Sequence, residues 1–184
     1  MVFLDVVLAA LVAGKLLGGS VGTLADTPIK GMRLAFAAIA LQVIAFPSGV
    51  FPWGMASSAS RALWLVSYAL LLAMLLRNAR LFGIPVVVAG LLSNLVAILA
   101  NGGLMPVRAS ALAAAQRSYS VHNNSIELVR PHLAALVDRW AVPSWIPLGN
   151  VYSIGDVLIA TGVFLAIVAA MRAHRAVAVA PALG

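Results

Sequence analysis

Five long apolar runs, separated by short polar segments, make up most of the chain. The runs cover residues 2–17, 34–51, 62–76, 81–100 and 154–171. A bilayer core takes about 20 helical residues to cross, and the run over 81–100 reaches that length without a charged residue. The pattern therefore predicts an all-α fold, a polytopic membrane helix bundle with about five transmembrane helices. The runs over 2–17 and 62–76 are short for a full crossing, and a buried helix that does not span is the alternative for each.

The longest polar part of the chain lies between the last two apolar runs. We expect residues 102–153 to form a small extracytoplasmic helical cap on a single integral membrane domain that covers residues 1–184. Residues 107–116 are rich in alanine and predict a short helix. Ser125 offers an N-cap for a second, amphipathic helix that we expect to reach Val137. An ordered loop that binds no ligand is the alternative.

Composition supports lipid as the solvent. Of the 184 residues, 63% are hydrophobic and 9% are charged, whereas a soluble domain carries about 25% charged residues. Too few polar side chains remain to cover a water-soluble globule. The chain contains no cysteine, which excludes disulfides, thiolate catalysis and cysteine-ligated metals.

The positive charges predict the sidedness of the bundle. The net charge is +7, but the cations stand beside the apolar runs and form no single basic patch, so a nucleic-acid partner is not expected. If every run spans, three pairs of cations lie on one side: Lys30 and Arg33, Arg77 and Arg80, and Arg172 and Arg175. Cytoplasmic loops carry an excess of Lys and Arg. The prediction is an N-terminus outside and a C-terminus in the cytoplasm, with the lipid bilayer as the partner.

Small and amide residues share one face of the fourth run. They recur at steps of four, three and four, at Gly90, Asn94, Ala97 and Asn101, which aligns them on a helix. Such a face is either a ligand wall or a seam where helices approach closely and an amide bonds across. For Asn94 we favour the packing role. The fifth run has a similar stripe, at Gly155, Gly162, Ala166 and Ala169, so the two runs are expected to pack together.

Two polar signatures at the ends of these runs give the candidate site. Residues 101–106, Asn-Gly-Gly-Leu-Met-Pro, close the fourth run, and residues 153–156, Ser-Ile-Gly-Asp, open the fifth. We expect the two span ends to bring an amide and a carboxylate to one outer surface. The candidate ligand-binding residues are Asn94, Asn101, Gly102, Gly103 and Asp156.

Asp156 has two interpretations. A carboxylate inside a span usually pairs with another group or serves function, which favours a site acid facing Asn101. Ser153 at the N-cap, with Asp156 three residues later, also has the spacing of a capping box, and a helix N-terminus favours negative charge. Asp5 in the first run either supplies a second carboxylate or is a solvated terminal acid.

No metal and no cofactor are predicted. The histidines, at 122, 132 and 174, do not have metal-ligand spacing. The chain also has no phosphate-binding glycine-rich loop and no hydrolase nucleophile elbow.

The motifs carry a resemblance to a known family. Residues 18–19, 24–26, Gln42, 101–106 and 153–156 together resemble a family of small bacterial multi-span proteins described only as a domain of unknown function. The resemblance covers nearly the whole chain. It implies a bacterial cell membrane location and assigns no activity.

A second resemblance, less close, is to the lipoprotein signal peptidases, which hold two catalytic aspartates at the outer ends of their last two spans. Residues 93–97 and 153–156 occupy similar places, so that Asn94 and Asp156 match the family pattern. Ala97 stands where the first aspartate belongs, whereas an aspartyl mechanism needs two carboxyl groups.

Three functions remain open from the sequence. The leading hypothesis is a non-enzymatic membrane protein, either an accessory subunit of a membrane-protein partner or a binder of a lipid-like ligand, with an outer pocket formed by Asn101, Asp156 and the cap. The second is a membrane-embedded aspartyl-type hydrolase, which Ala97 disfavours. The third is a small transporter, which is disfavoured because Gln42 and Asn94 are the only strongly polar mid-span residues.

Overall fold

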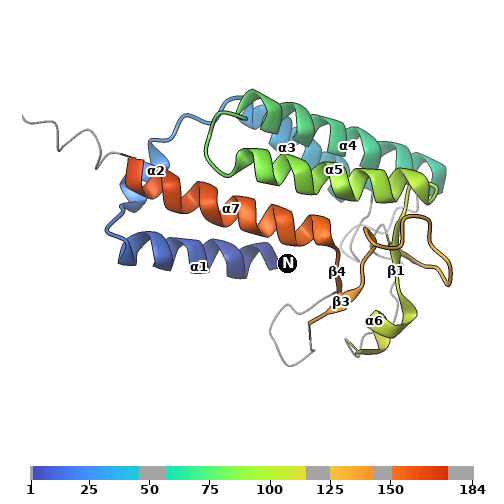
Figure 1. Cartoon of the computed structure of the whole chain (residues 1–184). Helices are drawn as coiled ribbons and strands as arrows, with labels where there is room; N and C mark the ends of the chain where they lie inside the picture. Colours follow the sequence, from blue (N-terminus) through green and yellow to red (C-terminus); the bar gives the residue numbers. More distant parts are fainter. Residues whose placement is uncertain (1, 46–56, 115–124, 143–150, 174–184) are drawn as a thin grey trace, which may run out of the picture.

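The computed structural model describes residues 2–45, 57–114, 125–142 and 151–173, which are mostly helical (Figure 1). The helices are α1 (Val2–Leu16), α2 (Val21–Ala25), α3 (Met32–Ala45), α4 (Ser57–Arg77), α5 (Ile84–Ala100), α6 (Ala109–Ala114) and α7 (Ile154–Arg172). The strands are β1 (Met105–Val107), β2 (Ser125–Glu127), β3 (Trp140–Ala141) and β4 (Val151–Tyr152). Each of the five apolar runs contains a long helix, which confirms the predicted helical class.

The long helices lie side by side in the order α3, α4, α5, α7 and α1, each in contact with the next. The helix α2 lies at one end of this layer, and the short strands with α6 lie at the other (Figure 1). Between α3 and α4, the Gln42 Nε2 atom donates a hydrogen bond of 3.1 Å to the Ser67 hydroxyl. A core cluster that includes Tyr68, Leu91 and Ile98 joins α4 to α5.

Two of the described helices are long and apolar enough to cross a membrane. They are the stretch Ser58–Arg77 within α4 and the whole of α7, Ile154–Arg172. The helices α3 and α5 are apolar but shorter, and the described part of α3 ends at Ala45. This supports a membrane location, whereas the predicted number of five crossings and the orientation stay predictions.

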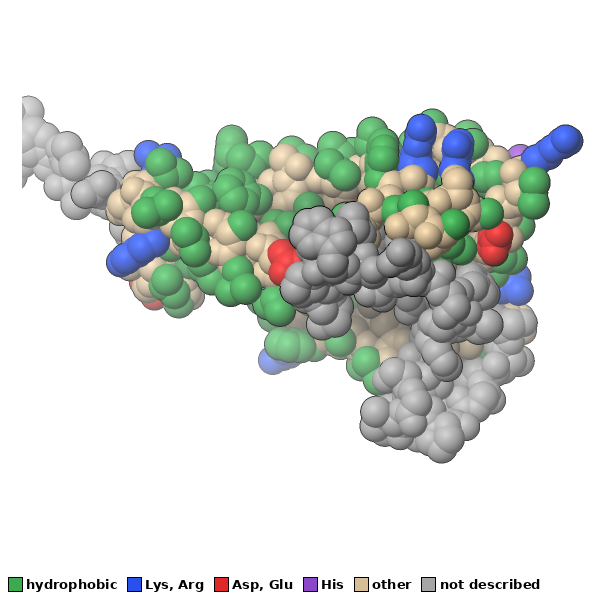
Figure 2. Space-filling model, turned by 90° about the horizontal axis from the view of Figure 1, so that it is seen from below, with side chains coloured by type: hydrophobic (Ala, Val, Ile, Leu, Met, Phe, Trp, Pro, Cys, Tyr) green, Lys and Arg blue, Asp and Glu red, His purple; other side chains and the backbone are tan. Residues whose placement is uncertain are grey.

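The exposed faces of the helices are strongly apolar. On α1, the side chains at four-residue steps are 50, 53, 60 and 82% exposed, at Leu4, Leu8, Val12 and Leu16. Soluble monomers rarely expose continuous apolar patches of this kind. Figure 2 shows apolar side chains over much of the visible surface of the helices. These faces are suited to lipid contact.

Glycines set a very close contact between α5 and α7. A Cβ atom added to Gly90 would lie 2.5 Å from the Gly155 carbonyl oxygen, and one added to Gly162 would lie 2.6 Å from the Val87 nitrogen. Real Cβ atoms essentially never approach other atoms within 3.0 Å. The two backbones therefore touch only because these positions lack side chains, which confirms the predicted packing of the two small-residue stripes.

The two helices of this pair are staggered along their length. Gly162 packs against Gly83 and Val87 at the start of α5, so α7 continues beyond that contact to Arg172. Gly83 also packs against Ala166, so the part of α7 that extends past α5, from Ala166 to Arg172, is about 9 Å long at the helical rise per residue. Segments from the start of the chain cover part of it: the Ser20 amide donates a hydrogen bond of 2.8 Å to the carbonyl oxygen of Met171.

The described part of the segment between α5 and α7 contains one short helix and four short strands rather than the two helices that the sequence predicts. The short alanine-rich helix is present as α6, but Ser125 begins the strand β2 and no helix follows it within residues 125–142. The strand β1 pairs in parallel with β2, and β3 pairs antiparallel with β4. Residues 115–124 and 143–150 lie outside the described part of the chain.

Local chemistry explains why the helix predicted from Ser125 to Val137 is wrong. Pro131 has no amide hydrogen and its ring clashes with the preceding turn of a helix. Leu133 has a φ of 53°, in the left-handed region. The amide of Asp138 donates instead to the carbonyl oxygen of Pro106, at 3.0 Å, so this segment follows β1 rather than its own helical turns.

Basic residues from separate connections meet at the end of the layer opposite the strands. The Asn78 side chain clamps the two connections together: its Nδ2 atom donates to the Lys30 carbonyl oxygen at 2.8 Å, and its Oδ1 atom accepts from the Lys30 amide at 2.9 Å. Arg77 ends α4 and Arg172 ends α7 at the same end (Figure 1). The described cations predicted to share one side of the membrane thus share one end of the layer.

Candidate functional site

Three polar side chains form a buried hydrogen-bonded cluster where α7 begins. The Asn94 Nδ2 atom donates to the Asp156 Oδ1 atom at 2.9 Å. The Ser153 hydroxyl lies 2.8 Å from the Asn94 Oδ1 atom and 2.9 Å from the Asp156 Oδ2 atom. Because a hydroxyl has one hydrogen, it donates to one of these acceptors at a time. Ser153 and Asn94 are buried and Asp156 is partly buried, so the cluster takes the place of water for the two buried groups.

Asp156 caps its helix and also joins two helices. Its Oδ2 atom accepts a hydrogen bond of 3.0 Å from the Ser153 amide, while the Asp156 amide donates to the Ser153 hydroxyl at 3.1 Å. This is the predicted capping box. The partner of Asp156 on α5 is Asn94, and both carboxylate oxygens are engaged.

Asn101 lies in a separate cluster at the end of α5. Its Nδ2 atom donates to the carbonyl oxygens of Ala97 and His132, at 2.8 and 3.0 Å, and its Oδ1 atom accepts from the His132 amide at 2.9 Å. Asn101 therefore fastens the segment after β2 to the end of α5. The structure brings Asn94 and Asp156 together, but it does not bring Asn101 to Asp156.

The two glycines after Asn101 end the helix. Gly102 and Gly103 have φ values of 73° and 86°, which only glycine adopts readily. The Gly103 amide donates to the Ile98 carbonyl oxygen at 2.9 Å, and the Gly102 carbonyl oxygen accepts from the Arg61 guanidinium at 3.2 Å. Gly103 satisfies a carbonyl group at the end of α5 and Gly102 binds Arg61, so their geometry alone does not require a ligand.

Asp138 is an acidic residue near this region that the sequence did not single out. Its Oδ1 atom is buried and has no hydrogen-bond partner in the described part of the chain. Burial, and secondly the charge of Asp156, raises the pKa of Asp138 to about 8. In the sequence it stands beside Arg139, which resembles an exposed ion pair, whereas in the structure its backbone pairs with Val107 in β1.

The remaining candidates show no ligand chemistry. Asp5 is exposed in the first turn of α1 and makes no side-chain hydrogen bond to a described residue. The described ranges contain no group of three or more His, Asp or Glu residues that could hold a metal ion. His122 and His174 lie outside those ranges.

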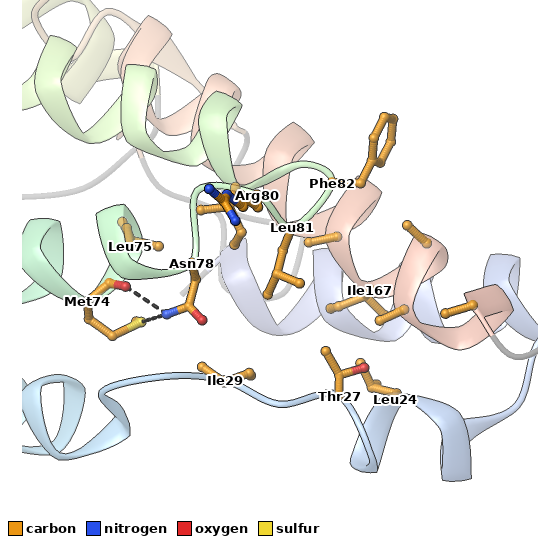
Figure 3. Close-up of a pocket in the computed structure, with 15 residues that line it drawn as sticks. Leu24, Thr27, Ile29, Met74, Leu75, Asn78, Arg80, Leu81, Phe82 and Ile167 are labelled. Atoms are coloured by element: carbon orange, nitrogen blue, oxygen red, sulfur yellow. Dashed lines mark hydrogen bonds between the residues drawn. The ribbon is translucent and has the colours of Figure 1, made fainter.

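An apolar pocket of about 370 Å³ lies at the end of the layer opposite Asp156. We call it the overhang pocket, because the part of α7 that extends past α5 forms one of its walls. Figure 3 shows Leu81 and Ile167 facing Leu24 and Ile29 across it, while Phe82 is directed away. Further lining residues are Thr27, Met74, Leu75, Asn78, Arg80, Ile84, Ala166, Ala169, Ala170 and Ala173. Sequence reasoning missed this pocket.

Comparison with known proteins places most of the chain in one family. A protein-family model described as a family of unknown function (DUF5317) matches residues 26–168. No curated protein matches the chain. No solved structure matches it. The predicted resemblance to an uncharacterised family is confirmed, whereas the resemblance to signal peptidases stays a prediction.

Proposed function

The chain belongs to DUF5317, a family of unknown function, and we propose that it is an integral membrane protein that binds a lipophilic molecule. The observation that carries this proposal is the overhang pocket, which is lined mainly by aliphatic side chains from three separate parts of the chain. We place the protein in the bacterial cell membrane, with the pocket towards the cytoplasm because the basic residues Lys30, Arg77 and Arg172 share that end.

The size and lining of the overhang pocket support a ligand rather than a packing defect. Small-molecule pockets usually enclose about 300 to 1,000 Å³ and are mostly apolar with few polar groups, and this pocket of 370 Å³ falls in that range. The polar side chain of Asn78 is already bonded to Lys30 and Met74. An apolar ligand would therefore leave no lining amide without a partner.

This proposal moves the ligand away from the outer pocket that the sequence favours. Asn94 and Asp156 bond to each other, and Asn101, Gly102 and Gly103 hold the end of α5 to neighbouring segments. In our proposal these five residues position helices and do not contact the ligand. An accessory role beside a membrane-protein partner is compatible with the exposed apolar face of α1.

Filling the pocket is expected to remove the ligand. Ala169 lines the pocket on α7, and Ala169→Phe places a ring in the space. We expect a lipophilic species to copurify with the wild-type protein in mild detergent and to fall by about tenfold or more in this variant, as read by native mass spectrometry. The matched control is Val157→Phe on the same helix, where the side chain is 51% exposed. Equal ligand content in wild type and Ala169→Phe would overturn the proposal.

A second candidate, a membrane-embedded aspartyl-type hydrolase, is favoured by the position of Asp138. An aspartyl mechanism needs two carboxyl groups whose pKa values are pushed apart. Asp138 lies close enough to Asp156 for the Asp156 charge to act on it, and its Oδ1 atom has no described partner. It could therefore replace the acid that is missing at Ala97. Against this candidate, both oxygens of Asp156 already accept hydrogen bonds.

The hydrolase candidate predicts that both acids are needed. The purified protein would cleave a quenched fluorescent peptide that carries a lipidated cysteine, and Asp138→Asn and Asp156→Asn would each lower kcat by about 100-fold or more. Asp26→Asn, at an exposed acid near the other end, is the control. No cleavage by the wild-type protein, or full activity in either variant, would remove this candidate.

A further inference from the structure

The overhang pocket has a positively charged edge. Arg80 lines it and is exposed, and no described residue forms an ion pair with its guanidinium. The Asn78 clamp holds Lys30 at the same end, and the Arg77 Nη1 atom lies 3.4 Å from the position that a Cβ atom on Gly31 would take. Arg77 thus lies against the connection that carries Lys30, and Arg80 lies at the edge of the pocket.

The backbone at the pocket also favours an anion. Ile84, the first residue of α5, lines the pocket, and Gly83 before it gives no side-chain cap. The N-terminal end of a helix carries a partial positive charge that stabilises nearby anions. The α4 and α7 C-termini carry the opposite partial charge. The guanidinium of Arg80, which lines the pocket, is therefore the cation that an anionic group would meet there.

The rest of the pocket accepts hydrocarbon. Its walls come from Leu81, Ile167 and the alanines of α7. The neighbouring side chain of Phe82 is also apolar and is 67% exposed. A ligand that fits both the apolar walls and the edge at Arg80 must have an apolar chain and an anionic group next to that chain. A guanidinium is planar and presents paired donors that match two phosphate oxygens.

We propose that the overhang pocket binds an anionic glycerophospholipid from the bilayer, with an acyl chain between α7 and the α2–α3 connection and its phosphate group at Arg80. This inference rests on the proposed lipophilic ligand and adds the charge of its headgroup. A zwitterionic lipid would bring a cationic group close to Lys30 and Arg77, where like charges repel.

The test compares two lipids and two arginines. Delipidated protein is incubated with phosphatidylglycerol or phosphatidylcholine of identical acyl chains, and bound lipid is counted by native mass spectrometry. Wild type is expected to prefer phosphatidylglycerol by about tenfold, and Arg80→Gln to lower that preference to about twofold. Arg172→Gln, at the same end but outside the pocket lining, is expected to keep it. Size-exclusion chromatography establishes that both variants are folded.

Failure of the headgroup inference differs from failure of the proposed function. Equal binding of the two lipids by wild type, or an equal loss in Arg80→Gln and Arg172→Gln, would overturn the anionic preference. If Ala169→Phe still removes both lipids in that case, the lipophilic pocket stands. If Ala169→Phe keeps both lipids, the pocket is not the binding site and both proposals fail.

Discussion

Gly155→Ala is expected to be among the most destabilising single methyl additions in the chain. The new Cβ atom would overlap the Asn94 side-chain oxygen and lie 2.7 Å from the Gly90 carbonyl oxygen. It would therefore push α7 from α5 and disturb the Asn94–Ser153–Asp156 cluster at once. We expect a loss of about 3 kcal/mol in unfolding free energy, or a fall of roughly 10 °C in the apparent Tm in detergent.

A matched substitution separates this contact from the general effect of replacing a helical glycine. Gly22 lies in α2, and a Cβ atom there would meet only the Ser20 hydroxyl, at 3.5 Å. Gly22→Ala is expected to leave the apparent Tm unchanged or to raise it slightly, because alanine favours the helix. If the Gly155→Ala and Gly22→Ala variants have the same apparent Tm, the close approach of α5 and α7 does not stabilise the protein.

The same pair of helices shows what the sequence could predict. The spacing of Gly90 and Asn94 on one run and of Gly155 and Gly162 on the next indicates two narrow faces, and the structure packs these faces together. Periodicity identifies a face because it depends on residues within one helix. The register between the helices depends on which small groups interlock, and a single sequence carries no pattern for it.

The missed stagger accounts for both errors about the site. If α5 ended at the level where α7 begins, Asp156 would lie beside Asn101. The glycine contacts instead place Asp156 beside Asn94. The same offset leaves the end of α7 uncovered and opens the overhang pocket. The segment between the helices escaped prediction for another reason: strands of two or three residues are too short to show alternation, and β1 pairs with a strand many positions away.

Asp138 is the second residue for which we expect a large effect, and its effect depends on pH. Burial, and then the charge of Asp156, raises the pKa of Asp138 from its usual 3.8 to about 8 in the folded protein. Between these values the unfolded chain has lost the proton and the folded chain has kept it. The folded state therefore binds more protons, and stability falls as pH rises.

Asp138→Asn is expected to abolish this pH dependence, because an amide has nearly the shape of a carboxyl group and does not ionise. The wild-type unfolding free energy should fall by up to about 1.4 kcal/mol per pH unit from this group between pH 4 and pH 8, and by nothing further above that range. The variant should match wild type near pH 4 and exceed it by several kcal/mol at pH 8, as measured by unfolding in detergent across that range.

Asp26→Asn, which removes an exposed acid, controls for the change in net charge. A constant difference between Asp138→Asn and wild type at all pH values would mean that Asp138 is ionised in the folded protein. The carboxyl group would then need a cationic or donor partner, which the described residues do not provide for its Oδ1 atom.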